Sequence, residues 1–199
     1  GVPVVVPRPA RKPGHRPVVA MVARFTAEKG HAIFLRACRR LVETYPLLEI
    51  RLAGAGPLEE AMRRLTEDLG LSGHVVFAGV VEDIPSFLQD ADILVLPSFT
   101  EGLPNAVVEA LLMEVPVVAT AVGGVPEIIT DQEHGLLVRP GDPEALAGAM
   151  DLMLKDPVRA HQMAHAGRKR VEQVFSFGRM VDAYLSIYED ALQAAGRRG

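Results

Sequence analysis

The sequence lacks tryptophan, has one cysteine and contains no long uninterrupted apolar run. Its 199 residues are 49% hydrophobic and 23% charged, as in ordinary globular proteins. The single cysteine, Cys38, cannot form a disulfide within the chain, which favours a reducing, cytoplasmic location. The longest apolar stretch, at residues 106–125, is interrupted by Glu109, Glu114 and Pro116. It therefore falls short of the ~20 apolar residues that a transmembrane helix needs.

Charge is distributed unevenly along the chain. Residues 1–40 hold nine Lys and Arg against one acid (+8), residues 41–154 hold four against nineteen (-15), and residues 155–199 hold eight against five (+3). Nucleic-acid binding would call for basic residues together with aromatic rings that stack on bases, but only 5% of the chain is aromatic. Nucleic acid is therefore not an expected partner. A small anion such as a diphosphate, which needs only one or two cations, is compatible with the sequence.

Short β-branched runs alternate with helical segments from Pro17 onward. The runs are apolar on both faces, as in strands of a parallel sheet that helices cover on each side. This pattern predicts an α/β fold with a doubly wound, Rossmann-like parallel sheet. The predicted strands are residues 17–23, 48–54, 74–79, 92–98, 115–121 and 135–138, and the first two predicted helices are residues 31–44 and 57–69.

Both ends of the chain differ from this central pattern. The first seventeen residues contain five prolines and no apolar period, so residues 1–16 are expected to be a linker. After Val138 the sequence predicts three helices, at about 142–154, 157–170 and 176–194. The last carries a continuous apolar stripe at helical spacing, formed by Phe177, Met180, Val181, Tyr184, Leu185 and Tyr188. We therefore expect an α/β domain over residues 17–175 and a separate carboxy-terminal helix over 176–199.

Ligands of doubly wound sheets bind beyond the carboxyl ends of the strands, so the residues after each strand are the candidates for a site. Arg24 and Lys29 follow the first strand within one short loop. An arginine can donate two hydrogen bonds to phosphate oxygens while a lysine supplies a point charge. The pair predicts a diphosphate site, although two solvated surface cations would give the same sequence.

Gly54-Ala55-Gly56 follows the second strand and raises the alternative of a dinucleotide-binding oxidoreductase domain. That fingerprint requires a third glycine where Glu59 stands, and it follows the first strand of a sheet. We interpret the segment as a tight turn into the next helix.

The segment after the fourth predicted strand is the most informative. Pro104 suits the first turn of a helix, so a helix is expected to begin at Leu103 or Pro104 with free backbone N–H groups that attract anions. Glu101 precedes this helix and Glu109 lies within it, separated by seven residues. Carboxylates beside a phosphate would be repelled unless they accept hydrogen bonds from hydroxyls, such as those of a ribose or a sugar. A loop acid and a surface acid are the alternative interpretation.

At this point the sequence resembles the nucleotide-sugar half of retaining glycosyltransferases of family 4, which have the two-domain GT-B architecture. The matching blocks follow the family's order over about residues 17–170. They are residues 22–30, Gly54-Ala55-Gly56-Pro57, Phe77-Ala78-Gly79-Val80, 92–98, Glu101-Gly102-Leu103-Pro104-Asn105 with Glu109-Ala110, Gly123-Gly124-Val125-Pro126-Glu127 and Gly135-Leu136-Leu137-Val138. One departure is His134, where the family usually has asparagine in a turn.

The resemblance implies a role for each matching residue. Arg24 and Lys29 would hold the diphosphate of a UDP- or GDP-linked donor, Glu109 its ribose, and Glu101 the transferred hexose. Arg24, Lys29 and Glu101 would thereby also take part in catalysis. The backbone of Val81 would meet the nucleobase, and the segment Gly102, Leu103, Pro104 and Asn105 would add N–H groups to the anion site.

The resemblance further implies metal-independent transfer to an acceptor hydroxyl, with no cofactor. It implies a missing amino-terminal domain that binds the acceptor, toward which the carboxy-terminal helix would pack, so this chain alone is expected to be inactive. Peripheral attachment of the full-length protein to the inner membrane face is left open. A non-catalytic nucleotide-sugar-binding or regulatory module is the alternative function.

Three other groups of residues are alternative candidates for chemical sites. Asp90 and Asp92 match the DxD pattern of a different, metal-dependent glycosyltransferase architecture, but they precede a strand instead of following one, so we interpret Asp92 as opening the strand. His161 and His165 share a helix face without the glutamate of a zinc protease motif. Cys38 lies on the apolar stripe of its helix, which favours packing over nucleophilic chemistry.

Overall fold

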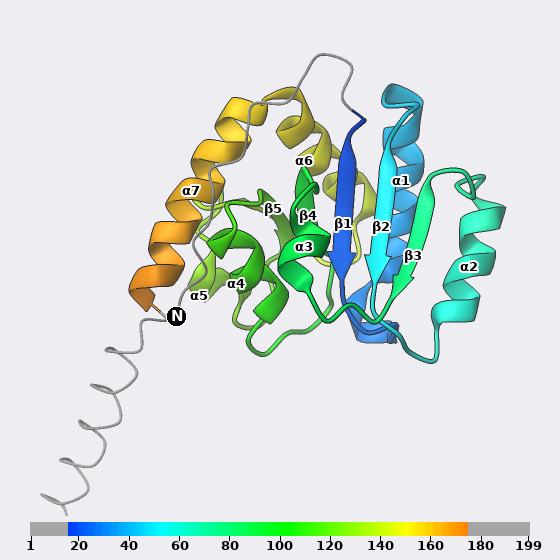
Figure 1. Cartoon of the computed structure of the whole chain (residues 1–199), viewed down its shortest axis with the longest axis horizontal. Coiled ribbons are helices and arrows are strands. Elements are labelled where there is room, and N and C mark those ends of the chain that lie inside the picture. Colours follow the sequence, from blue (N-terminus) through cyan, green and yellow to red (C-terminus); the bar gives the residue numbers. More distant parts are fainter. Residues whose placement is uncertain (1–15, 175–199) are drawn as a thin grey trace, which may run out of the picture.

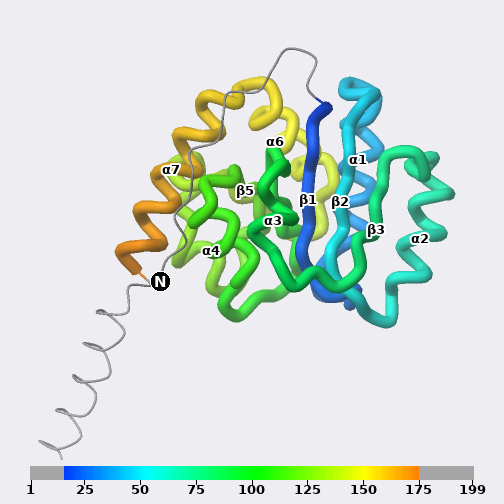
Figure 2. The backbone as a smooth tube through the Cα atoms, in the orientation of Figure 1, coloured from blue at the N-terminus to red at the C-terminus, as the bar shows by residue number. Residues whose placement is uncertain are grey.

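The computed structural model describes residues 16–174 as a six-stranded parallel sheet flanked by helices (Figures 1 and 2). The strands are β1 (Val18–Val22), β2 (Glu49–Ala53), β3 (Val75–Gly79), β4 (Ile93–Leu96), β5 (Val117–Thr120) and β6 (Leu136–Val138). The spatial order is β3-β2-β1-β4-β5-β6. The chain thus adds strands on one side of β1 and then on the other, which confirms the doubly wound fold.

The helices follow the strands in alternation. They are α1 (His31–Thr44), α2 (Glu59–Asp68), α3 (Ile84–Leu88), α4 (Asn105–Leu112), α5 (Val125–Ile128), α6 (Pro143–Lys155) and α7 (Pro157–Val174), with a 3-10 turn, η1 (Ala27–Lys29), before α1. Helix α1 has the bounds predicted from its apolar stripe. Helices α3 and α5 were not predicted from the sequence, because segments of four or five residues are too short to display a helical period. Helix α4 begins at Asn105, one residue beyond the later predicted start.

Two hydrophobic cores lie on the two faces of the sheet because successive strand residues point to opposite sides. In β1, Val19 and Met21 face the core under α1, α2 and α6, whereas Val18 and Ala20 face the core under α3, α4 and α5. Helix α7 contributes to both cores, through Met163 to the first and Val171 to the second.

The edge strand β3 departs from the prediction that every strand is buried on both faces. Val75 and Phe77 pack against the first core, but Val76 on the opposite face is 47% exposed. The second core includes no residue of β3, so that face of the strand is left uncovered. The apolar run at 74–79 therefore predicted the strand correctly and its burial incorrectly.

The predicted domain boundaries are not tested by this structure. The linker at 1–16 falls, except for Arg16, outside the described residues, and so does the predicted helix at 176–199 with its apolar stripe. No helix between residues 16 and 174 is long and apolar enough to cross a membrane.

Candidate functional site

The candidate site lies where the direction of strand addition reverses. β1 and β4 are neighbours at the centre of the sheet, and the chain leaves them toward opposite faces. The carboxyl ends of such a strand pair form the crevice in which doubly wound folds bind ligands. Both segments singled out from the sequence, 24–30 and 97–105, are the loops that follow these two strands.

Close backbone contacts hold the two loops together. The N–H of Phe99 donates to the carbonyl of Glu28 at 2.7 Å. Gly30 adopts a left-handed conformation (φ 72°), and a Cβ there would lie 2.2 Å from the carbonyl oxygen of Pro97. Only glycine fits this approach without moving the backbone. The loop after β1, which contains Lys29, is therefore fixed against the loop after β4.

Lys29 and Glu101 form an ion pair at the centre of the site. The Nζ of Lys29 lies 2.8 Å from the Oε1 of Glu101, whose side chain is only 6% exposed. The hydroxyl of Ser98 donates to the same oxygen at 2.6 Å. Because a buried carboxylate is costly unless it is paired and hydrogen-bonded, both partners stabilise its position. The structure thus brings together Lys29 and Glu101, for which the family resemblance implies contacts with neighbouring parts of one ligand.

The loop after β5 supports Glu101 from the other side. Gly123 has a φ of 52°, and a Cβ there would lie 1.8 Å from the carbonyl oxygen of Glu101. Gly124 donates its N–H to the carbonyl of Gly102 at 3.2 Å. This glycine pair is therefore the surface on which the backbone of Glu101 and Gly102 rests.

Arg24 and Val81 lie together in a cavity at the carboxyl edge of the sheet. Both line a cavity of about 420 Å³ over the carboxyl ends of β1, β2 and β3, whose other lining residues are Val22, Ala23, Ala53, Gly54, Ala55, Val80 and Ile84. Arg24 is exposed and supplies the only charge among these lining residues. An apolar cavity with one arginine at its side suits a flat ring attached to an anion.

The start of α4 offers fewer free donors than its sequence suggests. Pro104 is buried and has no N–H, and the N–H of Asn105 donates to the carbonyl of Leu103 at 3.0 Å. The N–H groups of Gly102 and Leu103 donate to no acceptor within residues 16–174. These two groups, both on exposed residues, are the free donors of the predicted segment.

Glu109 lies in the second turn of α4 and is half-buried. Burial raises the pKa of its carboxyl group, and no side-chain donor reaches it within the described part of the chain. A partly desolvated carboxylate without a donor is stabilised by a ligand that brings hydroxyl groups.

A stack of aromatic rings holds the loop after β1 in place through Phe25. The Phe25 ring stacks on His31 at 4.2 Å and on Phe77 at 6.0 Å between ring centroids, and the Arg63 guanidinium lies 4.1 Å from the Phe77 centroid. Burial lowers the pKa of His31 to about 4, so its imidazole is neutral at pH 7. The backbone of Phe25 packs so closely on Gly56 that a Cβ there would lie 2.6 Å from its carbonyl oxygen. This packing confirms the interpretation of Gly54-Ala55-Gly56 as a tight turn before α2.

The rival constellations have structural roles. The Asp92 carboxylate accepts the backbone N–H of Val18 at 2.7 Å and so ties the start of β4 to β1. Burial raises the pKa of the Cys38 thiol well above its usual value, which keeps it protonated. His165 is 54% exposed on its side chain and contacts Glu114. No cluster of three or more His, Cys, Asp or Glu within residues 16–174 is arranged to hold a metal ion.

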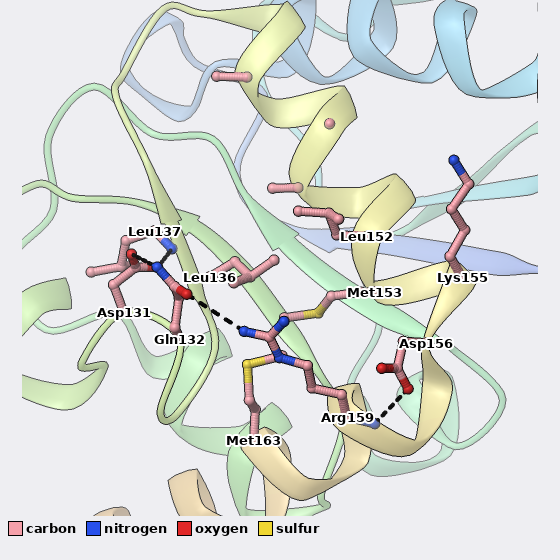
Figure 3. A pocket seen from close by; sticks show the side chains of 13 residues that line it. Asp131, Gln132, Leu136, Leu137, Leu152, Met153, Lys155, Asp156, Arg159 and Met163 are labelled. Atoms are coloured by element: carbon pink, nitrogen blue, oxygen red, sulfur yellow. Dashed lines mark hydrogen bonds between the residues drawn. The ribbon is translucent and has the colours of Figure 1, made fainter.

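A larger cavity of about 520 Å³ lies away from these residues, between β6, α6 and the start of α7 (Figure 3). Its floor is apolar, and its polar groups already have partners in the protein. The Asp131 carboxylate accepts the N–H of Leu137 at 2.8 Å, Asp156 accepts the N–H of Arg159 at 3.0 Å, and Lys155 pairs with Asp151. The cavity contains none of the residues predicted from sequence.

No role in the site was predicted from the sequence for Ser98, Thr120, Gly123 or Gly124. Ser98 and Thr120 are fully buried, and the Thr120 hydroxyl donates to the carbonyl of Ser98 at 2.5 Å. The available signal for Ser98 and Thr120 was their position, because each stands at the carboxyl end of a buried strand, the edge at which doubly wound sheets bind ligands.

Comparisons with known proteins identify the family to which the chain belongs. The sequence profile of the family described as Glycosyl transferases group 1 matches residues 6–170. The GDP-mannose-dependent alpha-(1-6)-phosphatidylinositol monomannoside mannosyltransferase of Mycolicibacterium smegmatis is 36% identical over 164 residues, 78% of this chain and 43% of that protein. The lipopolysaccharide core biosynthesis glycosyltransferase LpsE of Rhizobium meliloti is 34% identical over 175 residues, 88% of this chain and 50% of that protein. The chain thus spans about half the length of the curated relatives it matches.

Solved structures show the same correspondence. The C-terminal domain of the glycosyl transferase group 1 family protein LpcC from Francisella tularensis is 26% identical, with a TM-score of 0.74 over 81% of this chain and 87% of that one. HepE from Anabaena, solved in complex with UDP-glucose, is 26% identical, with a TM-score of 0.77 over 85% of this chain and 48% of that one. With its six parallel strands and flanking helices, the chain belongs to the group 1 glycosyl transferases and corresponds to the carboxy-terminal domain of the GT-B architecture.

Proposed function

We propose that this chain is the donor-binding half of a retaining, metal-independent glycosyltransferase that moves a hexose from a nucleoside-diphosphate sugar to an acceptor hydroxyl. The observation that carries the proposal is the ion pair of Lys29 and Glu101, which joins the loops after β1 and β4 at the switch point of the sheet. The acceptor-binding half lies outside this chain in the proposal. The cytoplasmic location, with or without contact to the inner membrane face, stays a prediction.

The chemistry follows from the charges around this point. As the bond from sugar to phosphate breaks, negative charge develops on the leaving diphosphate. Arg24, Lys29 and the free N–H groups of Gly102 and Leu103 are positive groups fixed in place before that charge appears, and such preorganised donors are usually the largest contribution to catalysis. Lys29 has three N–H donors, of which Glu101 engages one, so the other two can reach phosphate oxygens and draw the ammonium group away from the carboxylate.

The carboxylates would bind the two hydroxyl-bearing parts of the donor. Glu109, on α4, would accept hydrogen bonds from the ribose, and Glu101 from the transferred sugar. The apolar cavity beside Arg24 would hold the base against the backbone of Val81. The relatives support both UDP and GDP as the nucleotide, since one is named for GDP-mannose and another was solved with UDP-glucose.

Binding without metal is the direct test of this function. We expect UDP-glucose or GDP-mannose, together with the matching free diphosphate, to bind the chain in EDTA as tightly as in magnesium. Arg24→Ala should weaken that binding about tenfold, because it removes a charge-assisted hydrogen bond. Isothermal titration calorimetry measures both effects, with Arg64→Ala on the outer face of α2 as the matched control. Strict dependence on magnesium or manganese, or equal losses for the two arginine variants, would refute the site.

Substitutions of Glu109 and Glu101 should weaken the binding of different ligands. Glu109→Ala is expected to weaken free nucleotide and nucleotide sugar alike, by about tenfold, because both carry the ribose. Glu101→Ala should weaken only the nucleotide sugar, since removal of this carboxylate also releases Lys29 to the diphosphate. Titrations of each variant with diphosphate and with sugar conjugate give the comparison, and Glu67→Ala on α2 serves as the control. Equal losses for both ligands in Glu101→Ala would contradict the assignment of this residue to the sugar.

A further inference from the structure

Ser98 is a fully buried hydroxyl to which neither the sequence nor the proposed chemistry assigns a role. It stands just after β4, and its Oγ donates to the Oε1 of Glu101 at 2.6 Å. The Nζ of Lys29 donates to that same oxygen at 2.8 Å. Two donors from different loops therefore converge on one oxygen of a single carboxylate.

The second oxygen of Glu101 is left available. Within residues 16–174, Oε2 accepts no hydrogen bond. It is also not among the buried side-chain atoms that lack a partner in this part of the chain, which are both nitrogens of His31. Oε2 therefore reaches solvent, and the carboxylate presents one occupied oxygen to the protein and one open oxygen to the ligand side.

Ser98 is itself held by the sheet. Thr120, at the end of β5, donates its hydroxyl to the carbonyl of Ser98 at 2.5 Å, and both residues are fully buried. A serine fixed in this way has little freedom to turn its hydroxyl away from Glu101. Lys29 differs, because its ammonium group stands on a flexible four-carbon stem and its side chain is 23% exposed.

We propose that Ser98 is a positioning residue that keeps Glu101 oriented toward the transferred sugar when Lys29 turns to the diphosphate. This inference rests on the proposed function. A bound diphosphate competes with Glu101 for the Lys29 ammonium, so the ion pair weakens at the moment when the carboxylate must meet the sugar. The Ser98 hydroxyl is neutral and buried, and it keeps its hydrogen bond to Oε1 throughout. Ser98 thereby sets affinity for the sugar portion of the donor without contacting it.

The test compares two ligands on one variant. Ser98→Ala is expected to bind UDP-glucose or GDP-mannose, whichever the unaltered chain binds, about tenfold more weakly, because a hydrogen bond to a charged group is lost. Free UDP or GDP should bind within about twofold of the unaltered chain, since neither ligand carries the sugar. Isothermal titration calorimetry gives the ratio of the two affinities, which a general loosening of the fold would not change selectively.

Two further variants keep the inference falsifiable. Ser98→Cys retains the side chain's shape with a weaker donor, and it should give a smaller loss that is again confined to the nucleotide sugar. Thr66→Val removes a different buried hydroxyl, which donates to the carbonyl of Met62 in α2, and should change neither affinity. If Ser98→Ala does not fold, Ser98→Cys carries the test.

The outcomes separate this inference from the function on which it rests. If neither nucleotide sugar binds the unaltered chain, the proposed function fails. If one binds, equal losses of diphosphate and nucleotide sugar in the Ser98 variants, or no loss of either, would overturn the positioning role and leave the donor site standing.

Discussion

The 199-residue chain alone is expected to bind a nucleotide sugar and to transfer none of the sugar. Transfer requires an acceptor hydroxyl held on the anomeric carbon in a cleft that excludes water, and such positioning can contribute ~7–11 kcal/mol of barrier lowering. In the proposed function the residues of this chain contact only the sugar donor, and the chain spans about half the length of its curated relatives. Without a surface for the acceptor, the rate should therefore fall by several orders of magnitude.

A transfer assay with the donor that binds would measure this loss. The comparison is between this chain and a two-domain protein that contains the same sequence preceded by an acceptor-binding half. Calorimetric binding of the donor to both proteins is the control that the site is intact. Turnover by this chain at a rate similar to that of the two-domain protein would show that the proposed division of labour is wrong.

Gly123→Ala is expected to weaken donor binding strongly while the fold survives. A Cβ at this position would lie 1.8 Å from the carbonyl oxygen of Glu101, so one of the two loops must move. Displacement of that loop would shift the Glu101 carboxylate and the free N–H groups of Gly102 and Leu103 together. We expect at least a thirtyfold loss of affinity for the nucleotide sugar, on the order of 2 kcal/mol or more.

Gly70→Ala is the matched control for this substitution. Gly70 has a φ of 68°, close to the 52° of Gly123, but a Cβ there would meet no atom within 4 Å. Both variants carry the strain of a left-handed alanine, on the order of 1 kcal/mol, and should stay folded with a lower melting temperature, the decrease being larger for Gly123→Ala because a loop must also move. Only Gly123→Ala should lose binding in calorimetry. Retained affinity in Gly123→Ala would show that the loop accommodates the added carbon.

The fold could be predicted from the sequence because its signals are local. Alternating apolar runs and a helical stripe specify six strands and α1 without any knowledge of distant residues. The same local signals predicted too much burial for β3, since Val76 is apolar but lies on an uncovered face of an edge strand. They gave no sign of α3 or α5, which are too short to show a period.

The site could be predicted only in part, because its geometry is not local. The strand ends identified Arg24, Lys29 and Glu101 as candidates, and the structure places them at or beside the switch point. The ion pair between Lys29 and Glu101 joins residues 72 positions apart, and no pattern within either loop specifies it. Nor does any local pattern show that Ser98 shares the same carboxylate oxygen, which depends on the packing of two loops.

The path of α7 has a consequence for how the domain unfolds. This helix contacts α6 on one side of the sheet and α4 and α5 on the other, with Met163 in the first core and Val171 in the second. If the helices on one face of the sheet open locally, α7 loses its contacts with them. The packing of α7 on the other face is then weakened as well. Cooperative units in native proteins follow such shared packing, so the two faces of the sheet are coupled into one unit. The loops of the proposed donor site consequently depend for their rigidity on the whole domain, including α7.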